Sequence, residues 1–132
     1  LIEKYIKGRE FSVGVLGDKV LPPIEIIPKE GFYDYKNKYQ AGLTEEVCPA
    51  NIDRVLKKRL KKLAMKIFKT LKLEVYGRMD LILDERTNEF YCLEANSLPG
   101  LTTMSLLPQE AKAVGIEYPE LIKLIIELSN KK

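Results

Sequence analysis

The amino-acid sequence predicts an α+β fold in which helices pack on a largely antiparallel sheet. Three observations carry this prediction: short apolar runs separated by Gly, Pro and Asp near the start, a hairpin pattern in the third quarter, and amphipathic helical patterns on either side of that hairpin. The predicted order is strands, a long loop, a helix, a hairpin, a second loop and two helices. A chain of 132 residues fits one domain.

The first half of the chain contains three predicted strands and a long loop. The strands cover residues 1–6, 10–16 and 19–27, and Gly8, Gly17-Asp18 and Pro22-Pro23 interrupt them. Residues 28–51 have no sustained period, but four aromatic residues lie between positions 32 and 39. A loop of this length in a compact domain is typically functional or disordered, and the clustered aromatics favour function.

The clearest helix is predicted over residues 52–72, with Asn51 as its N-cap. One helical stripe is apolar and contains Leu56, Leu60, Leu63, Ala64, Ile67, Phe68 and Leu71. The segment 53–72 has nine basic residues and one acidic residue, so the rest of the chain is acidic. We interpret the basic face of this helix as a solvated surface.

The second half of the chain is predicted to hold a hairpin followed by two helices. Strands at 75–83 and 90–95 flank a polar turn at 84–89. A helix begins near Leu107, with Pro108 in its first turn, and ends at Gly115. The last helix begins near Pro119 and has an apolar face that contains Leu121, Leu124, Ile125 and Leu128.

The composition excludes several kinds of chemistry. The chain has no His, so it can form neither a Ser–His–Asp or Cys–His nucleophile system nor a histidine-ligated zinc site. Two Cys residues are too few for a disulfide scaffold, and no apolar run reaches the length of a membrane span. We therefore expect a reducing, cytoplasmic compartment. The chain starts with a strand-like Leu, and we expect that it was cut from a longer protein.

The hairpin contains the most informative polar residues. If the turn centres near residue 87, Asp80 faces Glu94 and Arg78 faces Asn96, and all four side chains share one face of the sheet. Two carboxylates and an amide oxygen suit Mg²⁺, and Arg offers a fork of donors for phosphate or an oxyanion. The alternative is a surface network in which Arg78 only neutralises the two acids. The opposite face is predicted to be core, formed by Met79, Leu81, Leu83, Tyr91, Leu93 and Ala95.

The segment after the hairpin, residues 96–105, is rich in small polar residues and leads into a helix. Gly100 allows backbone N–H groups to approach an anion there, and a helix N-terminus attracts negative charge. This pattern alone is weak evidence, because many helices follow a Ser/Thr-rich loop.

Six short segments carry a family resemblance. They are residues 8–13 (GREFSV), 32–39 (FYDYKNKY), 48–50 (CPA), 77–80 (GRMD), 93–102 (LEANSLPGLT) and 105–108 (SLLP). In this order they resemble the D-alanine–D-alanine ligases of the ATP-grasp superfamily. The resemblance covers nearly the whole chain and implies an ATP-grasp carboxy-terminal domain with a long Ω-loop. It also implies ATP-dependent joining of two D-alanines through an acyl phosphate, for bacterial peptidoglycan precursors.

The resemblance implies a role for each matching residue near the reacting groups. Asp80, Glu94 and Asn96 would hold two Mg²⁺ ions, for which Mn²⁺ can substitute, with Glu94 as the bridge. Arg78 and the Gly100 N–H would stabilise the oxyanion of the tetrahedral state. Ser105 and the Leu106 backbone would hold the carboxylate of the second D-alanine.

Further roles fall on the Ω-loop and on the amino-terminal segment. Lys38 would reach the γ-phosphate, Tyr39 would latch the Ω-loop, and Tyr33 would line the site. Glu3, Lys4 and Ile6 would belong to the adenine-binding segment, and Glu10 would bind the ribose hydroxyls. Without the resemblance, Glu3 and Glu10 are equally well explained as solvated strand residues. For the loop tyrosines, packing of the loop is the less favoured alternative.

The resemblance also implies that residues 1–132 are only the carboxy-terminal part of the enzyme, whose amino-terminal and central domains have no counterpart in this chain. We expect the full-length enzyme to be a homodimer and this chain to have no ligase activity alone. A D-alanine–D-lactate ligase, or another ATP-grasp carboxylate–amine ligase, is the alternative within the class, and the Lys38-Tyr39 pair favours a peptide product. From another class, the basic helix could bind nucleic acid, but no binding motif accompanies it; we expect neither nucleic-acid nor membrane partners.

Overall fold

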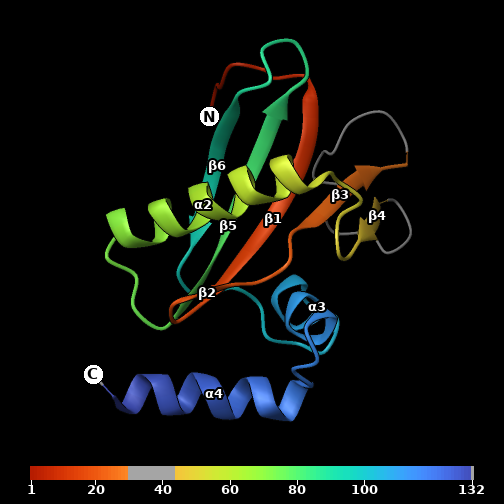
Figure 1. Ribbon diagram of the computed structural model, residues 1–132. Coiled ribbons are helices and arrows are strands. Elements are labelled where there is room, and N and C mark those ends of the chain that lie inside the picture. Colours follow the sequence, from red (N-terminus) through yellow and green to blue (C-terminus); the bar gives the residue numbers. More distant parts are fainter. Residues whose placement is uncertain (30–43, 132) are drawn as a thin grey trace.

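A computed structural model describes residues 1–29 and 44–131 of the chain. The described strands form one sheet in the order β4-β3-β1-β5-β6, and β2 pairs with β1 outside this path. Every strand pair is antiparallel. Helices cover this sheet (Figure 1), which confirms the α+β fold. The strands are β1 (Gly8–Leu16), β2 (Lys19–Val20), β3 (Ile24–Pro28), β4 (Thr44–Val47), β5 (Tyr76–Asp84) and β6 (Phe90–Asn96), and the helices are α2 (Arg54–Thr70), α3 (Leu106–Ala113) and α4 (Tyr118–Asn130).

The main core lies between α2 and one face of the sheet. Alternate residues of the two central strands, β1 and β5, point to this face, as the period of two requires. The fully buried residues of this cluster are Phe11, Val13, Val15, Leu60, Ala64, Met79 and Leu81. The three buried residues of α2 belong to the stripe expected from its sequence, whereas Leu71, just beyond the last turn, is 53% exposed.

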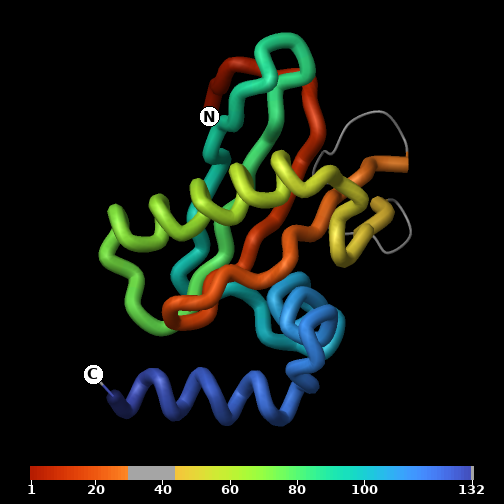
Figure 2. The backbone as a smooth tube through the Cα atoms, in the orientation of Figure 1, coloured from red at the N-terminus to blue at the C-terminus, as the bar shows by residue number. Residues whose placement is uncertain are grey.

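A second, smaller cluster joins the last two helices to the end of β1. It contains Leu16, Leu21, Leu107, Ala111 and Leu121. The face of α4 expected to be apolar packs against this cluster through Leu124, Ile125 and Leu128. The carboxy-terminal end of α4 therefore lies at one end of the molecule, and the amino terminus lies near the turn between β5 and β6 at the other (Figure 2).

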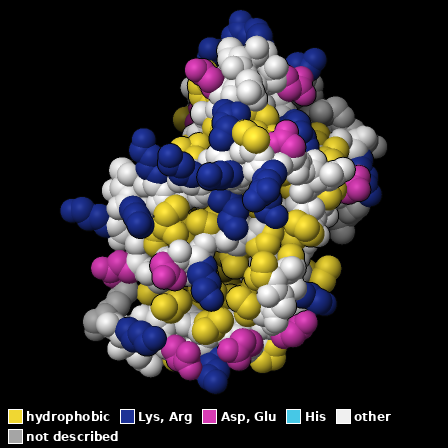
Figure 3. Space-filling view, viewed as in Figure 1, with side chains coloured by type: hydrophobic (Ala, Val, Ile, Leu, Met, Phe, Trp, Pro, Cys, Tyr) yellow, Lys and Arg dark blue, Asp and Glu magenta, His cyan; other side chains and the backbone are white. Residues whose placement is uncertain are grey.

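Helix α2 begins later than expected. Asp53, not Asn51, is its N-cap: the Asp53 carboxylate accepts the N–H of Leu56 at 2.7 Å. The Ile52 N–H is already bonded to the carbonyl of Ala50 in a turn before the helix, so residue 51 lies outside the first helical turn. The exposed face of α2 carries the basic side chains, which form a band across the molecule (Figure 3).

Of the strand predictions at the amino-terminal end, the one at residues 1–6 was wrong and the one at 19–27 was wrong in part. Residues 1–7 form no ladder with a described strand, and Leu1 and Ile2 are fully exposed, because an extended segment becomes a strand only when its backbone groups find a partner. The run at 19–27 is divided at Pro22-Pro23 into β2 and β3. Strand β4 also lies within the segment expected to be loop, where it pairs with β3. Within the described residues, no helix is both long and apolar enough to cross a membrane.

Candidate active site

The β5–β6 hairpin brings the four expected residues together on the face of the sheet opposite α2. Arg78 pairs with Asn96 and Asp80 pairs with Glu94, as the sequence predicted. The register then shifts, so that Leu81 pairs with Cys92 and Leu93 is an extra residue. This β-bulge compensates for a turn shorter than expected, and it keeps Glu94 opposite Asp80.

The bulge also explains why two predicted core residues were wrong. Leu93 is 47% exposed, since it is the unpaired residue of the bulge. Tyr91 pairs with Ile82 rather than facing the buried side, and Phe90 packs against the main core instead. Met79, Leu81, Leu83 and Ala95 lie in or against the main core, as predicted.

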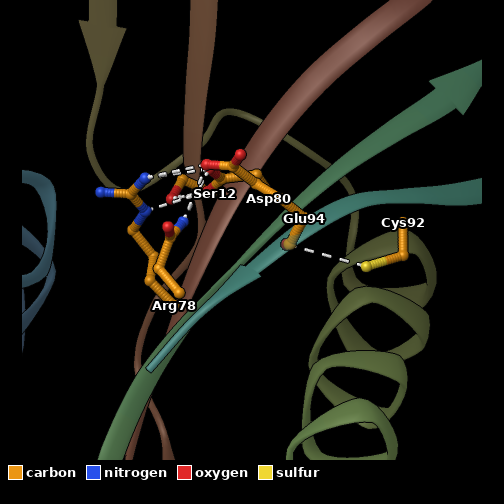
Figure 4. Close-up of polar contacts among 6 residues, drawn as sticks. Ser12, Arg78, Asp80, Cys92 and Glu94 are labelled. Atoms are coloured by element: carbon orange, nitrogen blue, oxygen red, sulfur yellow. Dashed lines mark hydrogen bonds and ion pairs between the residues drawn. The ribbon is translucent and has the colours of Figure 1, made fainter. Parts of the chain in front are cut away.

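Arg78 forms a forked ion pair with Asp80. Its Nε lies 3.0 Å from Asp80 Oδ1, and its Nη2 lies 2.9 Å from Asp80 Oδ2 (Figure 4). The same Nη2 is 3.9 Å from Glu94 Oε1. Only 15% of the Arg78 side chain is exposed, compared with 48% for Glu94. The guanidinium therefore lies inside the site, and Glu94 is the carboxylate most accessible to a ligand.

Ser12 is a site residue that the sequence analysis missed. Its hydroxyl is completely buried and donates to Asp80 Oδ1 at 2.8 Å, from the neighbouring strand β1 (Figure 4). Ser12 and Asp80 are direct partners in the β1–β5 ladder. The available signal was a small polar residue between the apolar Phe11 and Val13, at a position that faces away from the α2 core.

The charged side chains of the site are partly buried, so the two carboxylates affect the pKa of Arg78. Burial alone would lower the pKa of Arg78, but its hydrogen bonds to Asp80 and the negative charges of Asp80 and Glu94 outweigh this effect and raise it. The guanidinium thus stays charged at every physiological pH. It is a permanent cation next to two carboxylates.

The side chains at the hairpin fit a hard divalent cation. The amide nitrogen of Asn96 lies 3.0 Å from Glu94 Oε1 and 3.3 Å from Asp80 Oδ2, so one amide group touches both carboxylates. The three side chains carry the carboxylate and amide oxygens that Mg²⁺ prefers, and in this structure the Asn96 amide nitrogen donates to both acids. The described residues contain no group of three His, Cys, Asp or Glu side chains arranged for a metal, so any metal here depends on the amide as well.

The segment after β6 forms a tight loop before α3. The Ser105 hydroxyl accepts the N–H of Thr102 at 3.1 Å and lies 2.7 Å from the Thr102 hydroxyl. A Cβ on Gly100 would lie 2.9 Å from Ser105 Oγ, so a glycine is needed for this close approach. Ser105 is the N-cap residue of α3 but does not cap it with its side chain, and Leu106 is the first helical residue. The first N–H groups of α3 are therefore available to an anion.

The other expected site residues lie apart from the hairpin or outside the described residues. Glu3 and Lys4 are exposed, and Ile6 is half-buried, in the segment that precedes β1. Lys4 and Ile6 line a surface hollow together with the start of the β5–β6 turn. Glu10 lies on β1, two residues before Ser12, and so faces the same side of the sheet as the hairpin site. Tyr33, Lys38 and Tyr39, with the expected Ω-loop, lie outside the described residues.

Relatives of known name match almost the entire chain. A family model described as "D-ala D-ala ligase C-terminus" matches residues 1–127. The D-alanine–D-alanine ligase of Vesicomyosocius okutanii is 43% identical over 126 residues, which are 96% of this chain and 43% of that protein. D-alanine–D-alanine ligase B of Clostridium perfringens is 45% identical over 133 residues, which are 100% of this chain and 43% of that protein. The chain thus spans less than half the length of these relatives.

Solved structures agree with the sequence matches. The D-alanine–D-alanine ligase of Bacillus anthracis complexed with ATP superposes with a TM-score of 0.83 and 40% identity, over 98% of this chain and 42% of that chain. The VanG D-Ala:D-Ser ligase of Enterococcus faecalis superposes with a TM-score of 0.80 and 32% identity, over 96% of this chain and 37% of that chain. The fold is therefore that of an ATP-grasp carboxy-terminal domain, and the chain belongs to the family of D-alanine–D-alanine ligase carboxy-terminal domains.

Proposed function

We propose that residues 1–132 are the carboxy-terminal part of an ATP-dependent ligase that joins two D-alanines to form D-alanyl-D-alanine. The observation that carries the proposal is the convergence of one guanidinium, two carboxylates and one amide on the sheet face that α2 leaves uncovered. This set suits the handling of phosphate groups and a divalent cation, chemistry that requires no histidine. The family membership supports the choice of substrates.

In this proposal Asp80, Glu94 and Asn96 would hold two Mg²⁺ ions, for which Mn²⁺ can substitute, with Glu94 serving both. Bound there, the cations neutralise charge on the transferring phosphate. The exposure of Glu94 and the proximity of the Asn96 amide to both carboxylates support this assignment. Ser12 keeps one oxygen of Asp80 in place through its hydrogen bond.

The reaction itself has two steps. A carboxylate oxygen of the first D-alanine forms a bond to the γ-phosphorus of ATP while the bond to ADP breaks, which gives an acyl phosphate. The amine of the second D-alanine then attacks the carbonyl carbon, loses a proton, and expels inorganic phosphate. Arg78 and the N–H of Gly100 donate hydrogen bonds to the oxyanion that forms on that carbonyl oxygen. Arg78 suits this task because its charge is permanent and its fork is held by Asp80.

The remaining residues bind the substrates. Ser105 and the Leu106 N–H hold the carboxylate of the second D-alanine, and the available N–H groups at the start of α3 support this role. Glu3, Lys4 and Ile6 contact the adenine, and Glu10 binds the ribose hydroxyls. From the Ω-loop, Lys38 reaches the γ-phosphate, Tyr39 latches the loop and Tyr33 lines the site.

The proposal is tested on the full-length enzyme with ATP, Mg²⁺ and D-alanine. The wild type should form D-alanyl-D-alanine and inorganic phosphate in equal amounts. Glu94→Gln should lose at least about 100-fold in kcat and should need more Mg²⁺ for ATP binding, while Glu45→Gln, an exposed residue on β4, serves as the matched control. Unchanged Mg²⁺-dependent ATP binding and turnover in Glu94→Gln would remove the metal assignment.

The second substrate is the open point within the class, because one structural neighbour is a D-Ala:D-Ser ligase. We propose D-alanine, on the basis of the Lys38-Tyr39 pair. Competition among D-alanine, D-serine and D-lactate, with product analysis, decides the matter, and a preference for D-lactate or D-serine would contradict the proposal. We further propose a cytoplasmic, homodimeric full-length enzyme with no nucleic-acid partner, which cell fractionation and light scattering of the full-length protein can test.

A further inference from the structure

Helix α3 carries a carboxyl group that none of the roles above uses. Glu110 is completely buried. Its Oε2 accepts the backbone N–H of Gly14 on β1, whereas its Oε1 has no hydrogen-bond partner among the described residues. A buried side chain of this kind costs stability, so its position calls for a specific explanation.

The N–H of Gly14 needs an acceptor because β1 has lost its neighbouring strand at that point. The ladder with β3 ends at Ser12, and the ladder with β2 starts only at Val15. Pro22-Pro23 lies in the interval between β2 and β3. The carboxyl of Glu110 fills the gap in the ladder and accepts the hydrogen bond that a strand would otherwise accept.

Gly14 also allows α3 to lie directly on the sheet. A Cβ at this position would overlap Leu107 Cδ1 and Glu110 Oε2, so a larger residue would force these two side chains of α3 out of their places. The close approach and the hydrogen bond act at the same place. Together they determine how closely α3 packs against β1.

This contact links two parts of the candidate active site. Gly14 is the ladder partner of Arg78 on β5, and Ser105 lies at the start of the helix that carries Glu110. We propose that Glu110 is a positioning residue that fixes the start of α3, and with it Ser105, relative to Arg78. The inference rests on the proposed function, in which Ser105 holds the second D-alanine and Arg78 acts on the carbonyl that this D-alanine attacks.

The ionisation of Glu110 indicates which variant can replace it. Burial raises its pKa well above the usual value for Glu, an effect that the Gly14 N–H and the charge of Arg78 oppose but do not cancel. Burial thus favours the protonated form of this carboxyl. Glutamine keeps the same length and a carbonyl oxygen for Gly14, so Glu110→Gln preserves the contact, whereas Glu110→Met keeps the length but removes the acceptor.

The kinetic test compares these variants in the full-length enzyme, with Glu120→Gln, an exposed residue of α4, as the control. Glu110→Met should raise KM for the second D-alanine by roughly tenfold and lower kcat, since a misplaced subsite costs binding and orientation. KM for ATP should not change, because none of the residues proposed to contact the nucleotide lies on α3. Glu110→Gln should behave like the wild type. Equal changes in both KM values, or no change in either, would overturn the inference.

A second measurement does not depend on activity. In substrate-free full-length protein, the amide resonance of Leu106 and the Nε–H resonance of Arg78 should both shift in Glu110→Met and stay close to wild type in Glu110→Gln. If Glu110→Met leaves both resonances unchanged, the inference is wrong, whatever the enzyme catalyses. A wild type without ligase activity would instead refute the proposed function, while the resonances still decide the role of Glu110.

A milder change keeps the inference testable when Glu110→Met does not fold. Glu110→Asp keeps the carboxyl but shortens the side chain by one methylene group. It should raise KM for the second D-alanine less than Glu110→Met does, again without an effect on KM for ATP. An unfolded Glu110→Met together with unchanged kinetics and resonances in Glu110→Asp would also overturn the inference.

Discussion

Arg78 and Met79 are neighbours on β5 but lie on opposite faces of the sheet. Met79 is fully buried beneath α2, in a cluster made only of apolar side chains. Arg78 lies on the other face, where its partners are carboxylates and its charge is retained. One strand thus supplies both the core and the candidate active site. The difference indicates that the face under α2 holds the main core, while the opposite face carries polar side chains at positions of the same strand.

The largest expected effect concerns the core face. Phe11→Ala removes a fully buried ring that meets Phe90 edge-to-face, with 6.5 Å between the ring centroids. We expect it to lower the free energy of unfolding by about 3–5 kcal/mol. Urea unfolding, with hydrogen exchange of the β1 amides to locate the loss, measures the effect. Ser12→Ala, on the opposite face, should cost about 1 kcal/mol; an equal cost for both would mean that the two faces do not differ as described.

The next effect concerns the site face and should appear in activity rather than stability. Arg78→Lys keeps the positive charge but loses the planar fork that contacts Asp80. We expect kcat to fall by about 100- to 1000-fold, the usual cost of removing an oxyanion donor. Met79→Leu, the matched change on the other face, should cost less than about 1.5 kcal/mol of stability and leave kcat unchanged. Retention of full activity by Arg78→Lys would show that a point charge suffices.

The third effect tests the buried acid on the site face by its pH dependence. Because the pKa of Glu110 is raised in the folded state, its favourable contribution is complete below its unfolded pKa and is lost as pH rises through the folded pKa. The groups whose charges act on it are Arg78 and Asp80. Relative to the wild type, Glu110→Gln should therefore gain stability as pH rises, by at most about 1.4 kcal/mol per pH unit. Thermal midpoints of both proteins from pH 5 to about pH 9 check this, and parallel curves would contradict it.

The smallest expected effect concerns the β-bulge on β6, where Leu93 is the extra residue. Leu93 is apolar and was expected in the core, but it is 47% exposed. Leu93→Ser should change the free energy of unfolding by less than about 0.5 kcal/mol, as is usual at exposed positions. Leu81→Ser, at a fully buried position, provides the contrast. A large loss in Leu93→Ser would place this residue in the core after all.

Local patterns in the sequence were sufficient for much of the fold. The apolar stripe of α2 and the strands β1, β5 and β6 follow from periodicity, because alternate or helical spacing of apolar residues leaves few ways to bury them. The pairing of Asp80 with Glu94 also followed, since a short hairpin restricts the register. The strand predicted at residues 1–6 was wrong, because a strand forms only where a partner strand is available, and local sequence does not reveal that partner.

Sequence reasoning could identify only those site residues that lie on a single hairpin. Arg78, Asp80, Glu94 and Asn96 are close in the chain, so their convergence could be derived. Ser12 reaches the site across the β1–β5 ladder, from 68 positions away from Asp80, and no local pattern connects them. Roles assigned through the family resemblance, such as those of Ser105 and Gly100, remain predictions that the experiments above address.

By itself, the sequence determined the α+β class, the amphipathic α2 helix, the absence of histidine chemistry and the grouping of charges on the hairpin, because each depends on composition or on short-range periodicity. Only the tertiary structure decided where those groups act. The bulge at Leu93 exposed a side chain that its apolar character assigned to the core, and the gap beside Gly14 placed a buried carboxyl between α3 and the strand next to Arg78. Both depend on contacts between segments distant in the chain, which a local pattern of residues does not contain.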